Sequence, residues 1–148
     1  MSKDRLKVKV AVFNIFKRDG HILLLLRQNT GYRDGYWTFP AGHVDSGELP
    51  SEASKREAKE ETGTKVNKTT PLHIIFRRKT GEYTPYIDIY FAVETFTGEP
   101  RIPEAEKVKC AEMKWFPKNN FPNNLFPGLA NALVNIEKGI PYSEITED

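Results

Sequence analysis

A short acidic helix is the feature that most constrains what this chain can fold into and do. Proline favours the first position of a helix and glycine the position just past its end, so the sequence predicts a helix that begins at Pro50 and stops at Gly63. Successive helical residues are about 100° apart, which places Glu57, Glu60 and Glu61 on one face. Like charges at these spacings repel one another and destabilise an isolated helix. A face of this kind therefore needs a reason beyond helix stability.

A divalent cation supplies such a reason, because it turns the repulsion into binding. Carboxylate, carbonyl and water oxygens are the ligands that Mg²⁺ and Mn²⁺ prefer. Mg²⁺ held by a few carboxylates usually completes its coordination with water and substrate phosphates. Such a metal neutralises a diphosphate and lowers the pKa of a bound water, which are the needs of pyrophosphate hydrolysis. The competing interpretation is a solvated helix side with no ligand. We predict Mg²⁺ as the cofactor, with Mn²⁺ as a substitute.

The helix is part of a longer pattern, G-x5-E-x7-R-E-U-x-E-E-x-G-U, in which U is a bulky aliphatic residue. The chain has all seven fixed letters of this pattern: Gly42, Glu48, Arg56, Glu57, Glu60, Glu61 and Gly63. The stretch from Gly42 to Thr64 thereby resembles the Nudix box of the MutT/Nudix hydrolase family. Two variable positions differ, since Ala58 is small and Thr64 is polar. Residues 37–41 and 110–117 extend the resemblance on either side of the box.

The resemblance implies a role for each of the fixed polar positions. Glu60 and Glu61 would bind the metal, and Gly42 would offer it a backbone carbonyl. Glu57 would bind a metal or act as the general base, a role that varies within the family. Arg56 would orient the glutamates through a charge-assisted contact. The expected catalytic residues are therefore Glu57, Arg56 and Glu60.

Acids outside the helix are harder to assign. Glu48 is either a partner of Arg56 or an anion that favours the start of the helix through the helix dipole. Nudix enzymes often recruit one more acid from elsewhere, and Glu104 and Glu106 lie in the corresponding neighbourhood. Relatives often have a tighter Glu-Pro-Glu-Lys-Cys there, whereas this chain has two extra residues before Cys110. A solvated loop is the alternative for either acid.

Strand alternation suggests a second candidate for substrate binding. Tyr86, Asp88 and Tyr90 fall on one face of a predicted strand. An acid between two tyrosines could frame a nucleotide base, since the rings stack and the carboxylate accepts a hydrogen bond from a base amino group. The alternative is an ordinary strand face turned to solvent.

Several further residues are interpreted as structural. Trp37 and Phe39 are expected in the core, His43 in a loop with its ring bonded to backbone, and Cys110 as a small buried hydrophobe. The basic run 77–79 is interpreted as a solvated charge cluster, with phosphate contact as the alternative.

Hydrophobic patterning predicts one α/β domain over residues 1–148. Strands 8–16 and 21–27 are expected to form a hairpin across the Asp19-Gly20 turn, the second strand being buried on both faces. Further elements are expected as strands at 64–78, 84–96 and 110–116 and a helix at 127–138. A mixed β-sheet between helices, an α/β/α sandwich, is the most economical packing, and the resemblance implies the same Nudix-like fold.

The resemblance also implies the reaction class. We expect a Mg²⁺-dependent enzyme that cleaves the pyrophosphate linkage of a nucleoside diphosphate derivative. The leading substrate is a (d)NTP, oxidised forms included, with a nucleoside monophosphate and pyrophosphate as products. A nucleotide-sugar or dinucleoside polyphosphate hydrolase is the alternative enzyme. A non-catalytic nucleotide-sensing module is the third interpretation, but it would be expected to have lost acids of the box, and none is missing here.

Composition limits the remaining partners. The net charge of +2 is too small to indicate a nucleic-acid or membrane partner. One cysteine excludes an internal disulfide, which fits a reducing cytoplasm. The longest apolar run, 22–26, is far shorter than a membrane span, and the N-terminus has no signal-peptide core. We therefore expect a cytoplasmic protein with a small nucleotide as its partner, and leave a homodimer open.

Overall fold

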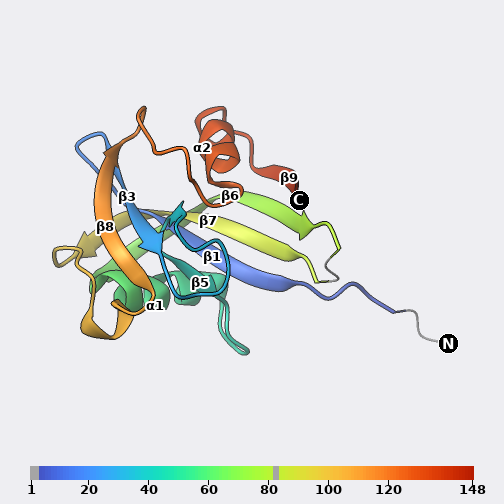
Figure 1. Ribbon diagram of the computed structural model, residues 1–148, viewed down its shortest axis with the longest axis horizontal. Coiled ribbons are helices and arrows are strands. Elements are labelled where there is room, and N and C mark those ends of the chain that lie inside the picture. The colour runs from blue at the N-terminus through green and yellow to red at the C-terminus, as the bar shows by residue number, and fades with distance from the viewer. Residues whose placement is uncertain (1–3, 82–83) are drawn as a thin grey trace.

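The computed structural model describes residues 4–81 and 84–148, and two helices lie on opposite sides of a sheet within them (Figure 1). Helix α1 (Pro50–Thr62) packs on one face, where Ala53 meets Val12. Helix α2 (Leu129–Glu137) packs on the other face. This arrangement confirms the predicted α/β sandwich. No helix in the described ranges is long and apolar enough to cross a membrane.

The sheet between the helices is mixed, as predicted. Its strands, in spatial order, are β5 (Ala41–His43), β1 (Lys9–Ile15), β7 (Tyr86–Thr97), β6 (Lys65–Lys79) and β9 (Tyr142–Glu147). The β1–β7 and β6–β9 pairs are parallel, whereas β1–β5 and β6–β7 are antiparallel. The two long strands β6 and β7 confirm the sequence prediction within a residue or two, and β9 is an element that the sequence analysis missed.

A second sheet carries the other strands, and all its pairs are antiparallel. Its central strand β3 (His21–Arg27) pairs with β8 (Cys110–Pro117) along its length, and with the two-residue strands β2 (Lys17–Arg18) and β4 (Trp37–Thr38) at its ends. The predicted burial of β3 is confirmed, because Ile22 to Leu25 are all buried.

The predicted hairpin between the first two long strands is wrong. Strands β1 and β3 lie in different sheets, and only residues 16–18 fold back on β3 across the predicted Asp19-Gly20 turn. The reason is that both edges of β1 are already hydrogen-bonded, one to β5 and the other to β7, so no edge remains for β3. Phe16, which is 0% exposed, joins the two sheets.

The face of β7 that carries Tyr86, Asp88 and Tyr90 is not turned to solvent. Asp88 and Tyr90 are 0% exposed, and the Tyr90 ring stacks on Phe13 with ring centroids 4.7 Å apart. Arg77, which was expected in a solvated cluster, is 4% exposed and donates to Asp88 at 2.6 and 3.2 Å. These two expectations fail because the segment before α2 packs over this side of the sheet, with the Phe126 ring beside Arg77.

The buried charges of Arg77 and Asp88 join a larger group through the unpredicted strand β9. Glu147 on β9 accepts hydrogen bonds from Arg77 at 3.1 Å, from Arg33 at 3.2 Å and from the Tyr32 hydroxyl. Burial alone would raise the pKa of Glu147, but the hydrogen bonds from Tyr32 and Arg77 outweigh it and lower that pKa. Glu147 thereby fastens β9 to the loop that precedes β4.

Replacing Glu147 with alanine is expected to lower the free energy of unfolding by about 1–3 kcal/mol at neutral pH, because its buried donors lose an acceptor. A carboxyl group whose pKa is lowered by folding stabilises above its unfolded pKa and loses that contribution as pH falls through its folded pKa. The deficit should therefore shrink in acid, well below the free glutamate pKa of about 4.3. Urea unfolding of the parent and the variant, at neutral and at acidic pH, measures this difference in the free energy of unfolding.

The matched control is Glu144→Ala on the same strand, where the side chain is exposed and, among the described residues, bonded only to Tyr142. It should change the free energy of unfolding by less than about 0.5 kcal/mol. Equal effects of the two substitutions at neutral pH would contradict a fastening role for Glu147.

Candidate active site

Helix α1 has the bounds that the sequence predicted, and its acidic face forms one wall of a cavity. It ends at Gly63, whose φ of 72° is the left-handed conformation that glycine adopts without strain. At its start Leu49 has no side-chain acceptor, and Glu52 instead accepts the Leu49 N–H at 2.8 Å. The face bearing Glu57, Glu60 and Glu61 lines a cavity of about 470 Å³. The predicted clustering of these three acids on one face is what the structure shows.

Strand β5 forms the opposite wall of the cavity, and Gly42 is the only residue of this strand without a side chain. The Glu57 carboxylate lies directly against Gly42: a Cβ at position 42 would be 2.1 Å from Glu57 Cδ. A contact that close leaves no room for a side chain while Glu57 keeps this position, so glycine serves here for the approach of a carboxylate rather than for a turn. The next residue back along the strand, Ala41, donates its N–H to Glu61 Oε1 at 2.6 Å.

Arg56 lies at the centre of the acidic group. Its Nε and Nη2 donate to the two oxygens of Glu48 at 2.7 and 2.9 Å. Its Nη1 donates to Glu57 at 2.7 Å and to Glu60 at 3.2 Å, and Nη2 also reaches the His43 carbonyl at 2.9 Å. Arg56 therefore donates to carboxylates of both loop and helix, and these are charge-assisted contacts of the kind that the resemblance implies. Glu48 is its bidentate partner, and this hydrogen bonding with Arg56 and the Asp45 N–H lowers the pKa of Glu48 to about 2.

The two acids deeper in the cavity have the opposite electrostatics. Burial raises the pKa of Glu57, against the effect of Arg56, and the side chain is only 14% exposed. Burial and the neighbouring Glu57 charge raise the pKa of Glu61 well above its usual value. Glu60 lies nearer the rim, with its side chain 51% exposed. Ionisation of Glu57 and Glu61 is therefore unfavourable unless a cation binds in this cavity.

The donor chemistry of the cavity fits a hard divalent cation, although the side chains are not drawn together around one. Over residues 4–81 and 84–148, no three acidic, histidine or cysteine side chains are grouped closely enough to hold a metal ion. Arg56 holds Glu57 and Glu60, and the Ala41 N–H holds Glu61. Carboxylate oxygens from one helix, beside a strand whose glycine admits them, are nonetheless the ligand set that Mg²⁺ prefers.

The structure separates the two acids of the 104–106 segment. Glu106 lines the same cavity as the helix acids. Glu104 is exposed on the short 3₁₀ turn Glu104–Glu106 and pairs with Lys107 at 2.8 Å. The cavity wall nearby includes Lys109 and Cys110, and burial raises the pKa of the Cys110 thiol.

The sequence analysis missed the basic side of the cavity. Arg27, at the end of β3, lines it and is held in place by hydrogen bonds to the Tyr32 carbonyl at 3.0 Å and to Thr30 Oγ1 at 3.1 Å. Asn29 and Thr30 also line it. An arginine that directly follows a buried apolar strand was the available signal, since such a charge needs a partner or a ligand.

The strand residues expected to frame a base do not line this cavity. Asp88 is bonded to Arg77 in the interior, and Tyr90 lies in the core. Tyr86 comes nearest, because its hydroxyl is 3.2 Å from Nε2 of His43, a cavity residue. The His43 ring therefore contacts Tyr86 rather than backbone. The expected core positions of Trp37 and Phe39 are confirmed.

An acidic helix packed on a glycine-bearing strand, with one arginine shared among its carboxylates, defines a hydrolase site of the Nudix type. The chain belongs to that family: the model of the NUDIX domain matches residues 5–135. The prediction of family and of hydrolase class is thereby confirmed.

Known relatives agree with this assignment. The chain is 32% identical over 117 residues to the ADP-ribose pyrophosphatase of Methanocaldococcus jannaschii, a match covering 79% of this chain and 66% of that protein. It is 28% identical over 119 residues to the 8-oxo-dGTP diphosphatase of Escherichia coli, covering 78% and 88% respectively. The crystal structure of a MutT NUDIX hydrolase from Burkholderia pseudomallei superposes with a TM-score of 0.79 at 27% identity, covering 86% of this chain and 97% of that one.

Proposed function

We propose that the protein is a Mg²⁺-dependent diphosphatase that converts a (d)NTP, oxidised forms included, to a nucleoside monophosphate and pyrophosphate. The observation that carries the proposal is the cavity in which Glu57, Glu60 and Glu61 of one helix face the glycine strand. The similarity to the E. coli 8-oxo-dGTP diphosphatase, over most of both chains, supports this substrate class.

A second candidate substrate is a nucleoside diphosphate joined to a sugar. The relative from M. jannaschii is named as an ADP-ribose pyrophosphatase, and it shares 32% identity with this chain. Both candidates present a diphosphate to the same acidic face, and they differ in what is attached beyond it. The acidic cavity supports what the two candidates share, which is a diphosphate bound beside the acids of α1.

The carboxylates of α1 would hold the metal, with the Gly42 carbonyl as an additional oxygen donor. Bound Mg²⁺ would supply neutralisation of the diphosphate and acidification of a water. Glu57, whose pKa is raised by burial, would accept the proton that this water loses. Arg56 would keep the carboxylates oriented, and Glu106 would be the acid contributed from outside the box.

The basic wall of the cavity supports phosphate binding. Arg27 and Lys109 line the cavity together with the acids of α1. Arginine offers a planar set of donors that matches phosphate oxygens, and lysine offers a point charge. The negative charge of a bound diphosphate would then be neutralised both by the metal and by these two side chains.

The test is a product screen over a panel of nucleotides with Mg²⁺ or Mn²⁺. Released pyrophosphate identifies (d)NTP cleavage, and release of AMP from ADP-ribose identifies the second candidate. Activity should vanish when a chelator is added and return when the metal is restored. Robust turnover in excess EDTA would end the proposal of a metal-dependent enzyme.

The affinity for metal should depend on pH in a defined direction. Because the pKa values of Glu57 and Glu61 are raised, these groups take up protons at a higher pH than a free glutamate does. Metal affinity should therefore weaken on acidification while free glutamates, with a pKa of about 4.3, are still ionised. Mn²⁺ titrations across pH measure this, and the rate of hydrolysis should peak in alkaline solution. A rate maximum near about pH 5 would contradict it.

A further inference from the structure

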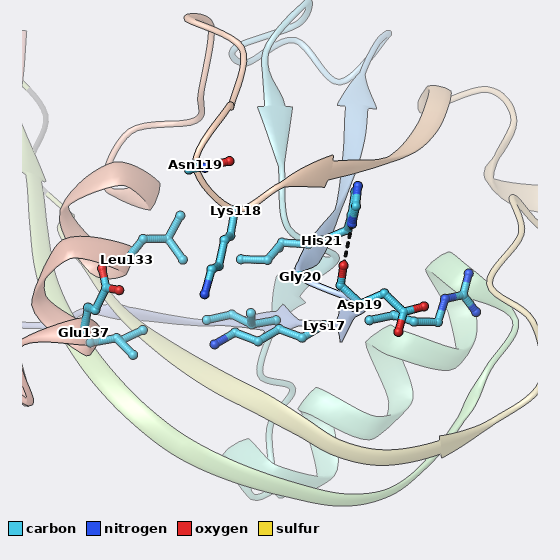
Figure 2. A pocket seen from close by; sticks show the side chains of 12 residues that line it. Lys17, Asp19, Gly20, His21, Lys118, Asn119, Leu133 and Glu137 are labelled. Carbon is cyan, nitrogen blue, oxygen red and sulfur yellow. Dashed lines mark hydrogen bonds between the residues drawn. The ribbon is translucent and has the colours of Figure 1, made fainter.

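A second cavity of about 500 Å³ lies between α2 and the turn that joins β2 to β3 (Figure 2). Within the described part of the chain it has no lining residue in common with the acidic cavity, and none of the roles described above uses it. Its volume is within the range of about 300–1,000 Å³ that is typical of small-molecule sites.

The floor of this cavity is apolar. Ile15 and Ile22, each 2% exposed, belong to the hydrophobic core, and Leu133 and Ile136 of α2 pack against the same core. Ile15 and Ile22 therefore form a rigid base, and Leu133 and Ile136 form a wall on the helix side. An apolar floor with a few polar groups at its edge is the usual composition of a ligand site.

Two lysines stand at the edge of this floor without an acidic partner. Among the described residues, no carboxylate lies within ion-pair distance of Lys17 or Lys118. The neighbouring Arg18, by contrast, is satisfied, because it donates to both oxygens of Glu99 at 2.8 Å and stacks on Trp115 at 4.4 Å. In Figure 2 the ammonium ends of Lys17 and Lys118 both point to the α2 side of the cavity.

The backbone beneath these lysines is fixed. The Lys118 N–H donates to the Gly20 carbonyl at 3.0 Å, which ties the segment after β8 to the β2–β3 turn. The His21 ring nitrogen Nδ1 lies 2.8 Å from the Asp19 carbonyl, within the same turn. Asp19 points away from the ammonium groups in Figure 2, and Glu137 stands across the cavity on α2. The two ammonium groups thus face the helix that carries Glu137.

We propose that this cavity is a second ligand site, which takes a small organic anion with one negatively charged end and an apolar body. The charged end, a phosphate monoester or a carboxylate, would lie between Lys17 and Lys118, and an aromatic or branched aliphatic body would cover Ile22 and Leu133. Glu137 disfavours a ligand that carries a second negative charge at the far end of its body.

Phenyl phosphate is a suitable probe, because it joins an aromatic ring to a phosphate monoester. The probe is titrated into the full chain without metal or nucleotide, and ¹⁵N–¹H spectra are recorded. The amide signals of Gly20, His21 and Asn119 should shift in a saturable way, whereas that of Gly42 in the acidic cavity should not. Inorganic phosphate and benzyl alcohol, each carrying half of the probe's chemistry, should bind more weakly.

The variant Lys17→Gln/Lys118→Gln should lower the affinity for phenyl phosphate by at least roughly tenfold, because both charge-assisted contacts are lost. The matched control Lys65→Gln/Lys68→Gln removes two exposed lysines on β6 and the same net charge, and should keep the parent affinity. Absence of saturable shifts around the cavity, or equal affinities of the two double variants, would overturn the proposal. Nucleotide hydrolysis should be unchanged in both, which separates this site from the catalytic one.

Discussion

Replacing Glu61 with glutamine is expected to lower the rate of nucleotide hydrolysis by at least about a hundredfold. The amide keeps the shape of the side chain, but it removes a charge from the floor of the acidic cavity, where a metal would depend on it. The loss should appear in kcat with saturating substrate and in a weaker affinity for Mn²⁺. Steady-state kinetics and a metal titration measure both.

The same substitution should leave the metal-free protein as stable as the parent or slightly more so. Burial raises the pKa of Glu61 well above its usual value, so the fold loses stability as pH rises from the free glutamate pKa of about 4.3 up to that raised pKa. Glutamine cannot ionise, and the repulsion with Glu57 also disappears, at about 0.2–0.5 kcal/mol per pair. A gain in stability together with a loss of activity would show that the Glu61 charge serves metal binding rather than the stability of the fold.

Lys59→Gln is the control for this experiment, because Lys59 is exposed on α1 and does not line the cavity. It should change the rate very little. Full activity of both Glu60→Gln and Glu61→Gln, together with an inactive Lys59→Gln, would show that the wrong face of the helix has been assigned.

Replacing Gly42 with alanine is expected to lower kcat/KM by roughly ten- to a hundredfold while the protein stays folded. The new methyl group would lie 2.1 Å from the present position of Glu57 Cδ, so one of the two groups must move. The displaced atoms belong to the end of a flexible side chain, so the fold can respond by moving the Glu57 carboxylate rather than the backbone. A shift of about 1 Å at a reacting group is enough for a loss of this size. Kinetics together with thermal unfolding measure the two effects separately.

A double-mutant cycle identifies the contact responsible. Glu57→Asp shortens the side chain and makes room for the added methyl group, so its effect and that of Gly42→Ala should not add. Strict additivity of the two losses in kcat/KM would mean that Gly42→Ala acts through something other than Glu57.

The helix and its acidic face could be predicted from the sequence because they depend on local spacing. Pro50, Gly63 and the three glutamates lie on one short segment, and helical periodicity alone brings the acids to one face. Gly42 and Arg56 were assigned through the family pattern: Arg56 makes the expected contact with a glutamate, and the close approach of Gly42 to Glu57 was not foreseen.

The rest of the site could not be predicted because it depends on contacts between distant segments. Arg27 is brought to the cavity by a strand of the second sheet, and Asp88 is buried with Arg77 beneath the segment before α2. Strand alternation gives the two faces of β7 but not which of them another segment buries. The split between β1 and β3 was missed for the same reason, since the partners of β1 are β5 and β7.

The placement of β1 also has a consequence for the order in which the protein folds. Strands β6 and β7 follow one another and pair antiparallel, whereas the parallel pairing of β1 with β7 joins Lys9 to Tyr86. Contacts that close long loops form late, because the chain entropy that they cost is not recovered until the sheet is assembled. Strand β5, which carries Gly42, pairs with β1. The cavity is therefore expected to be completed only in the last stage of folding, and cation binding would trap the finished sheet rather than nucleate it.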